Sequence, residues 1–82
     1  MERDFNFKFN RIKSLRQKKN LSQQVVADGI GTSQANLSRW EAGRITPSIL
    51  QCWKLAAFFG VSLDYLVGKD LFEENQINQT DS

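Results

Sequence analysis

Single glycines and one proline divide this chain into short segments, and within each segment apolar residues recur at every third or fourth position. These breaks are Gly29, Gly31, Gly43, Pro47, Gly60 and Gly68. Because a spacing of three and four places side chains on one face of an α-helix, the pattern predicts a series of short amphipathic helices. No segment alternates apolar and polar residues over the length of a strand. We therefore expect an all-α fold.

Five helices are expected, over residues 5–19, 23–29, 34–42, 47–59 and 63–67. Capping residues precede the last four, namely Ser22, Ser33, Thr46 (followed by Pro47) and Ser62. A chain of 82 residues has room for one core, so residues 1–68 are expected to form one compact domain. Residues 69–82 are polar, and this tail is expected either to be disordered or to pack on the fourth helix.

The composition favours a small binding module over an enzyme. The chain has no histidine and one cysteine, Cys52, which excludes histidine metal sites and an internal disulfide. We expect neither a metal nor another cofactor. No run approaches the roughly 18 apolar residues that a membrane span needs, and no secretory leader opens the chain, so a cytoplasmic protein without membrane contacts is expected. The carboxylates near the C-terminus have no partner base or phosphate-binding loop, so we expect no catalysis.

The net charge of +2 hides a segregation of charge along the chain. Up to Lys54 there are ten Lys and Arg residues against four Asp and Glu, whereas beyond it Lys69 stands against five acidic residues. A basic N-terminal part and an acidic C-terminal part suit a protein that presents one face to a polyanion. Lysines on solvated helix faces give the same count, so charge alone does not decide between these interpretations.

Residues 22–42 carry the most specific pattern, two short helices joined by a turn that contains glycine. Ala27 is small where the two helices cross, and Gly31 permits the turn. The core positions are Val26, Ile30 and Leu37. Such a helix-turn-helix can place its second helix in the major groove of DNA. The outer face of that helix carries short or polar side chains and one long cation, at Gln34, Ala35, Ser38 and Arg39.

Several pieces of the sequence also occur in the order and spacing of a known family. They are Arg11–Arg16, Leu21–Gln23, Gly31–Ser33, Trp40–Gly43, Pro47–Ser48 and Gly60–Leu66. In these pieces the chain resembles the Cro/C1-type, or xenobiotic-response-element-type, helix-turn-helix transcriptional regulators. The resemblance implies a compact five-helix, lambda-repressor-like domain that binds double-stranded DNA. It further implies a homodimer on an inverted-repeat operator, and a regulator that acts as a repressor.

The resemblance assigns roles to individual residues. The positions that match the family's base-facing residues are Ser33, Gln34, Ala35, Ser38 and Arg39, on the helix Gln34–Ala42. By its chemistry, a glutamine suits adenine and an arginine suits guanine, while an alanine suits a thymine methyl group. Arg39 also has a competing interpretation as a phosphate contact. Which bases are recognised does not follow from the sequence, because side-chain reach depends on the docking angle.

The positions that match phosphate contacts are Gln23, Asn36 and Arg44, together with backbone amides near Gly43. Gln23 also matches a glutamine that braces the recognition helix, and its alternative is a solvated residue of the first turn. Asn36 faces partly sideways and has the neighbouring helix as its alternative partner. Arg16 and Glu41 match a structural ion pair that links the first helix to the end of the third.

The expected fourth helix has two apolar stripes. One is the core set Ile49, Cys52, Leu55, Ala56 and Phe59, in which Cys52 is an inert small hydrophobe. The other is Leu50, Trp53 and Ala57, on a side that is normally solvated. Three candidates cover this second stripe: tail residues Leu71, Phe72 and Ile77, a second copy about a twofold axis, or Phe7 of the same chain. Phe5 and Phe9 fit the core, whereas Phe7 is expected to point elsewhere.

A protein-interaction module, antitoxin-like or anti-repressor-like, is the alternative to a DNA-binding regulator. An acidic or apolar outer face on the helix 34–42 would favour that class, and Gln34, Ser38 and Arg39 argue against it. RNA is disfavoured as a partner because the major groove of A-form RNA is too narrow for a recognition helix.

Overall fold

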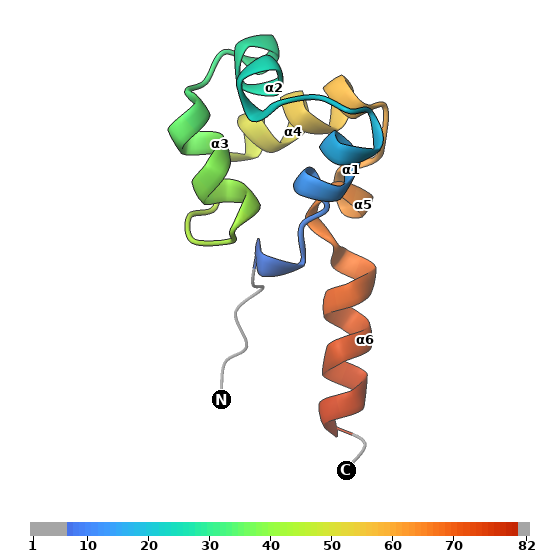
Figure 1. Ribbon diagram of the computed structural model, residues 1–82. Coiled ribbons are helices and arrows are strands. Elements are labelled where there is room, and N and C mark those ends of the chain that lie inside the picture. Colours follow the sequence, from blue (N-terminus) through green and yellow to red (C-terminus); the bar gives the residue numbers. More distant parts are fainter. Residues whose placement is uncertain (1–6, 81–82) are drawn as a thin grey trace.

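The computed structural model describes the backbone of residues 7–80 and the side chains of residues 7–74. Every regular element in this range is helical. The elements are the 3-10 helix η1 (Phe7–Phe9) and the α-helices α1 (Ile12–Lys18), α2 (Gln23–Ile30), α3 (Gln34–Glu41), α4 (Ile49–Phe59), α5 (Leu63–Val67) and α6 (Lys69–Thr80). Figure 1 shows α1 to α5 gathered into one body from which α6 projects. The all-α prediction is confirmed, with one α-helix more than expected, α6, and with a separate 3-10 helix, η1.

Serine side chains begin four of these helices. Ser22, Ser33, Ser48 and Ser62 each accept a hydrogen bond, at 3.1–3.2 Å, from the backbone N–H three residues later. A cap of this kind stabilises a helix by about 1 kcal/mol. At α4 the cap is reciprocal, because Gln51 Oε1 accepts from the Ser48 N–H at 3.1 Å. The start predicted at Thr46–Pro47 is therefore wrong, since the Ser48–Gln51 pair satisfies two backbone donors at once.

One apolar core joins α1 to α5 and η1. Its buried members are Phe7, Ile12, Leu15, Val26, Ala27, Ile30, Leu37, Trp40, Cys52, Leu55, Ala56, Phe59 and Leu66. Burial raises the pKa of the Cys52 thiol, which keeps it protonated. Four of the five predicted core residues of α4 are buried, but Ile49 is 70% exposed. Ile49 shares a side with Ala56, yet it is the first residue of the helix and projects beyond the packed part of the core.

The N-terminal region differs from the single helix predicted over residues 5–19. The chain forms η1, breaks at Asn10 and starts again as α1, and the Asn10 side chain explains the break. Its Nδ2 donates to the Phe7 carbonyl at 2.6 Å and to the Trp40 carbonyl at 3.0 Å, while its Oδ1 accepts from the Ile12 N–H at 2.9 Å. Because the break changes the helical phase, Phe7 is buried at 3% exposure, contrary to the prediction. Phe5 lies outside the described residues.

The tail also differs from the two forms predicted for it. Gly68 ends α5 with a φ of 78°, and the chain continues directly into α6. Arg11 holds the start of α6 with two hydrogen bonds of 2.8 Å to the Asp70 carboxylate, and the Phe72 ring meets the Phe9 ring edge-on at 6.1 Å. The start of the tail thus packs on the N-terminal region, and its described side chains, up to residue 74, leave α4 uncovered. The Ile77 side chain lies outside the described residues.

Candidate nucleic-acid interface

The helix-turn-helix predicted over residues 22–42 is present as α2, a short turn and α3. Gly31 adopts a φ of 76° at the end of α2, and the Thr32 N–H donates to the Ala27 carbonyl at 2.9 Å. Ser33 follows as the cap of α3. Buried apolar side chains pin both helices to the core, and α3 lies at the edge of the body, as Figure 1 shows. One side of α3 is consequently left for solvent or for a partner.

The residues predicted to face bases gather at this edge. Ser33, Gln34, Ala35 and Arg39 are exposed and Ser38 is half-buried. The buried side of the same helix is formed by Leu37 and Trp40. The structure therefore brings the five predicted base-facing residues to the start and the outer side of one helix, while their contact with bases stays a prediction.

Arg16 and Glu41 form the ion pair between α1 and the end of α3. Arg16 Nε donates to Glu41 Oε2 at 2.6 Å and Nη2 donates to Oε1 at 3.1 Å. The two side chains are only 13% and 4% exposed. The hydrogen bond to Glu41 raises the pKa of the Arg16 guanidinium, despite the opposing effect of burial. A two-pronged contact of this kind fixes geometry as well as charge, so it sets how α3 is held against the core.

Gln23 connects this ion pair to the outer face of α3. Its Nε2 donates to Glu41 Oε1 at 3.0 Å, and its Oε1 accepts from Gln34 Nε2. The side chain is half-buried. Gln23 therefore lies where bracing of the recognition helix was expected, and one of its two N–H groups has no hydrogen-bond acceptor among the described residues.

A second set of polar contacts runs along α3 itself. Asn36 Nδ2 donates to Thr32 Oγ1 at 3.2 Å, and Asn36 Oδ1 accepts from Arg39 Nη1 at 3.4 Å. Asn36 is half-buried, in line with the sideways direction expected for it. These contacts turn Asn36 toward the turn and toward Arg39, so its side chain orients the exposed cation.

The end of α3 differs in one respect from the expectation. The Gly43 and Arg44 N–H groups donate to the Trp40 and Arg39 carbonyls, both at 3.0 Å. These two amides close the helix end and are not free to bind phosphate. The Arg44 side chain is exposed and remains the candidate phosphate contact at this end.

Lys13 is a candidate phosphate contact that was not predicted from the sequence. A polar notch of about 180 Å³ lies between α1, α2 and α3, and its lining residues are Lys13, Gln23, Ser38, Glu41 and Ala42. Lys13 is exposed and brings an ammonium group to the side on which Gln23 and Ser38 lie. The signal was present in the sequence, because Lys13 lies three residues before Arg16 and so shares its helix face.

The second apolar stripe of α4 is uncovered. Trp53 is 66% exposed and Leu50 is 57% exposed, and Ile49 extends the stripe. Phe7 does not cover it, since Phe7 is buried in the core. We call Ile49, Leu50, Trp53 and Ala57 the α4 patch. A second copy of the chain, the remaining candidate to cover it, stays a prediction.

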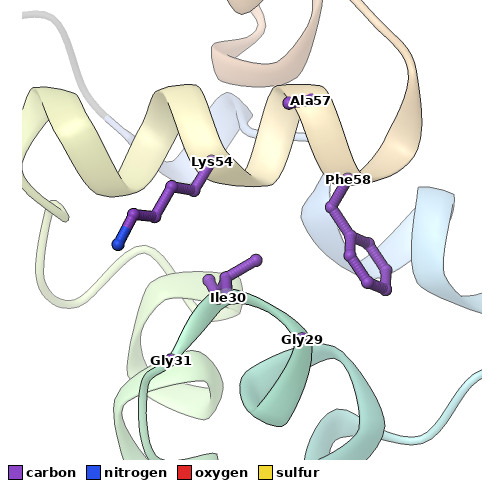
Figure 2. Close-up of a pocket in the computed structure, with 6 residues that line it drawn as sticks. All are labelled: Gly29, Ile30, Gly31, Lys54, Ala57 and Phe58. Atoms are coloured by element: carbon purple, nitrogen blue, oxygen red, sulfur yellow. The ribbon is translucent and has the colours of Figure 1, made fainter.

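An open depression of about 580 Å³ borders the α4 patch. Its lining residues are Gly29, Ile30, Gly31, Lys54, Ala57 and Phe58. Figure 2 shows Lys54 and Phe58 reaching from α4 toward α2 on either side of Ile30. Gly29 permits this approach, because a Cβ there would lie 2.5 Å from the Phe58 ring. The depression carries no group that suggests catalysis.

Neither a metal-binding cluster nor a membrane-spanning helix occurs in the described part of the chain. No group of three or more metal-ligating side chains occurs among these residues. No helix among them has the length and apolar character that crossing a membrane requires.

A family model described as helix-turn-helix matches residues 12–66, which is more than half of the chain. The chain belongs to the Cro/C1-type helix-turn-helix family. The match begins with α1 and ends within α5, so η1 and α6 flank the family domain.

Relatives of this helix-turn-helix chain are transcriptional regulators by name. The HTH-type transcriptional regulator ImmR of Bacillus subtilis is 37% identical over 71 residues, which are 87% of this chain and 54% of ImmR. The cryptic phage CTXphi transcriptional repressor RstR of Vibrio cholerae is 36% identical over 58 residues, 71% of this chain and 52% of RstR. The chain thus spans about half the length of these curated relatives.

The helix-turn-helix fold also has a counterpart among solved structures. The crystal structure of the restriction-modification controller protein C.AhdI from Aeromonas hydrophila matches with a TM-score of 0.67 and 27% sequence identity. The match covers 77% of this chain and 96% of C.AhdI. The lambda-repressor-like architecture predicted for α1 to α5 is confirmed by this likeness.

Proposed function

We propose that this chain is a sequence-specific double-stranded DNA-binding transcriptional regulator that places α3 in the major groove. The observation that carries the proposal is the outer face of α3, which is polar, largely exposed and connected to α1 by the largely buried Arg16–Glu41 pair. A helix face of this kind has no apolar surface to bury in a protein partner. It offers hydrogen-bonding groups of the types that base edges require.

In this proposal, Gln34 and Arg39 provide the long polar side chains for bases, at adenine and guanine respectively. Ala35 suits a thymine methyl group, and Ser33 and Ser38 complete the base-facing set. Phosphate contacts come from the residues around this face, namely Lys13, Gln23, Asn36 and Arg44. Asn36 has the additional task of orienting Arg39, as its 3.4 Å contact suggests.

We further propose that two copies pair through the α4 patch and bind an inverted repeat. An exposed tryptophan beside an exposed leucine and isoleucine is an unusual surface for a monomer. A twofold axis would bury the same patch on both copies. Trp53→Arg should convert the dimer into a monomer in sedimentation, because it places a charge at the centre of the patch. An unchanged mass would contradict this pairing.

The proposed mode of regulation is repression by occupation of the operator in the cytoplasm. The name of the relative RstR, a phage transcriptional repressor, supports this choice. Activation is the alternative mode, since the chain is also 33% identical, over 83% of its own length, to the HTH-type transcriptional activator BcrR of Enterococcus faecalis.

Selection of binding sites from a random duplex pool tests the proposal, at about 0.15 M salt for physiological screening. We expect an inverted repeat whose half-sites lie about 10 base pairs apart, centre to centre. A single half-site would retain DNA binding but contradict the dimer. No enrichment by the folded chain would contradict DNA binding and favour the protein-interaction class.

A further inference from the structure

The 3-10 helix η1 lies against the C-terminal end of α3 (Figure 1). Asn10, the residue after η1, donates from its Nδ2 to the Trp40 carbonyl at 3.0 Å. The backbone of Lys8 comes so near Gly43 that a Cβ on Gly43 would lie 2.8 Å from the Lys8 Cα. Phe7 is buried in the core and anchors η1 there. These contacts make η1 a fixed part of the surface at this end of α3.

Glycine at position 43 permits the close approach of Lys8. Its φ of 74° is left-handed, and a side chain there would collide with the Lys8 backbone. The next residue is Arg44, whose side chain is exposed and is the candidate phosphate contact at this end. Because Lys8 touches the residue directly before Arg44, two cations from distant segments meet at the same end of α3.

The Lys8 side chain is exposed and ends in a charge that is available to a polyanion. Its Nζ lies over the Phe9 ring, 5.3 Å from the ring centroid. A cation–π contact at an exposed site is weak, so a phosphate group can compete for the ammonium. A lysine ammonium is a compact point charge on a flexible stem, which suits a phosphate oxygen without requiring a fixed geometry.

Two roles are open to a cation in this place. Each strand of DNA carries a phosphate charge at every step of roughly 3.4 Å along the axis, so cations side by side can neutralise neighbouring phosphates. A cation near the C-terminal end of a helix also stabilises that helix through its dipole. The first role changes the affinity for DNA and its dependence on salt, whereas the second changes the stability of the free protein.

We propose that Lys8 is a phosphate contact and that η1 extends the DNA-binding surface beyond the helix-turn-helix. The family match begins at residue 12, so Lys8 lies outside the part of the chain that the family describes. The inference rests on the proposed function, because it requires DNA at the outer face of α3. A phosphate contact carries no base information, so Lys8 contributes affinity and leaves the recognised sequence unchanged.

The test measures the affinity for the selected operator at several salt concentrations between about 0.05 and 0.2 M. Each neutralised phosphate adds about 0.9 to the slope of log affinity against log salt concentration. Lys8→Gln removes one cation and keeps a long side chain. Lys69→Gln is the matched control for net charge, because Lys69 is exposed on α6 and pairs with Glu73 at the surface, at 3.7 Å.

Lys8→Gln should lower the slope by about one for each bound chain and weaken all duplexes alike. Lys8→Arg should keep the slope of the parent, and Lys69→Gln should leave it unchanged. An unchanged slope in Lys8→Gln overturns the inference, and the proposed function stays intact if the parent still selects its operator. An equal loss in Lys69→Gln would show that the slope follows net charge alone and would also overturn the inference. A parent that binds no DNA overturns both.

Urea denaturation without DNA separates the phosphate contact from the helix-dipole role. The Lys8→Gln midpoint should stay close to that of the parent while the salt slope falls. A lowered midpoint with an unchanged slope would make Lys8 a structural cation of α3 and overturn the inference. Combining Lys8→Gln with Arg44→Gln should lower the slope by about two per chain, because each residue contacts its own phosphate.

Discussion

Two arginines of the same N-terminal segment each bind a carboxylate with two hydrogen bonds, and the two carboxylates lie in opposite environments. Arg16 and Glu41 are 13% and 4% exposed, whereas Arg11 and Asp70 are 16% and 62% exposed. The first pair lies behind α3, and the second holds the start of α6 at the surface. The chemistry is the same and the two arginines are similarly shielded, so the difference lies in the carboxylate, which is nearly buried at Glu41 and solvated at Asp70.

The fold depends on the Arg16–Glu41 pair, whereas the Arg11–Asp70 pair contributes little to its stability. A charge left alone in the interior has no water to solvate it, so a buried pair cannot be broken cheaply. A charge left alone at the surface returns to water, and exposed pairs therefore contribute little. We infer that the ion pair that holds α3 is essential for the stability of the domain. The ion pair that holds α6 can be lost with little effect on stability.

The largest expected effect is at Glu41. Glu41→Ala removes the carboxylate from the largely buried Arg16 guanidinium, which keeps only the Leu21 carbonyl as acceptor, and should lower the free energy of unfolding by about 3–5 kcal/mol. Urea denaturation, monitored by circular dichroism, measures the free energy of unfolding. Arg16→Met with Glu41→Leu is the control and should stay close to the parent. A loss below 1 kcal/mol for Glu41→Ala would remove the distinction between the two pairs.

The next effect is at the junction with α6. Gly68 has a φ of 78°, and a Cβ there would lie 2.0 Å from the Phe9 carbonyl oxygen. Gly68→Ala should cost about 1–3 kcal/mol, because the strain of the left-handed conformation is joined by a clash with backbone. Gly60→Ala is the matched control, with a φ of 69° and no atom within 4 Å of the added Cβ. Equal losses at the two glycines would show that α5 and η1 are not in tight contact.

The smallest effect is at Asp70. The hydrogen bonds from Arg11 lower the pKa of the Asp70 carboxyl from its ordinary 3.8 to about 2. Because this pKa is lowered in the folded state, the contribution of the ionised Asp70 to stability is complete above about pH 3.8. It is lost as the pH falls to about 2. A carboxyl titration by NMR should find the low value in the parent and a value near 3.8 in Arg11→Gln. Asp70→Asn should leave DNA binding unchanged, and a loss of binding would make α6 part of the interface.

Much of the fold was predictable because its signals are local. A serine followed by an apolar period marks three of the helix starts, and glycines mark the ends of α2, α4 and α5. The outer face of α3 was predictable for the same reason, since it follows from helical spacing and from a family resemblance that covers it. The Arg16–Glu41 pair came from the resemblance alone, and the structure places its atoms 2.6 Å apart.

The wrong start of α4 has a local cause in the Ser48–Gln51 cap, but the larger errors occur where residues distant in sequence make contact. Asn10 breaks the first helix partly through its contact with the Trp40 carbonyl, 30 residues away, and the break buries Phe7. The attachment of α6 depends on Arg11, 59 residues before Asp70. The bracing role of Gln23 was predicted from the resemblance, and so was the ion pair of Glu41. The contact between Gln23 and Glu41 was not predicted. Periodicity and capping describe neighbours along the chain, so they contain no information on these pairings.

The central claim is that the outer face of α3 contacts bases. Binding-site selection carried out in parallel on the parent and on Gln34→Ala tests it most directly, since Gln34 is exposed and its replacement leaves the core and the ion pair intact. The account predicts the same motif from both proteins, with one position in each half-site losing its preference in the variant. An identical motif from both, or a general loss of enrichment without a position-specific change, would contradict it.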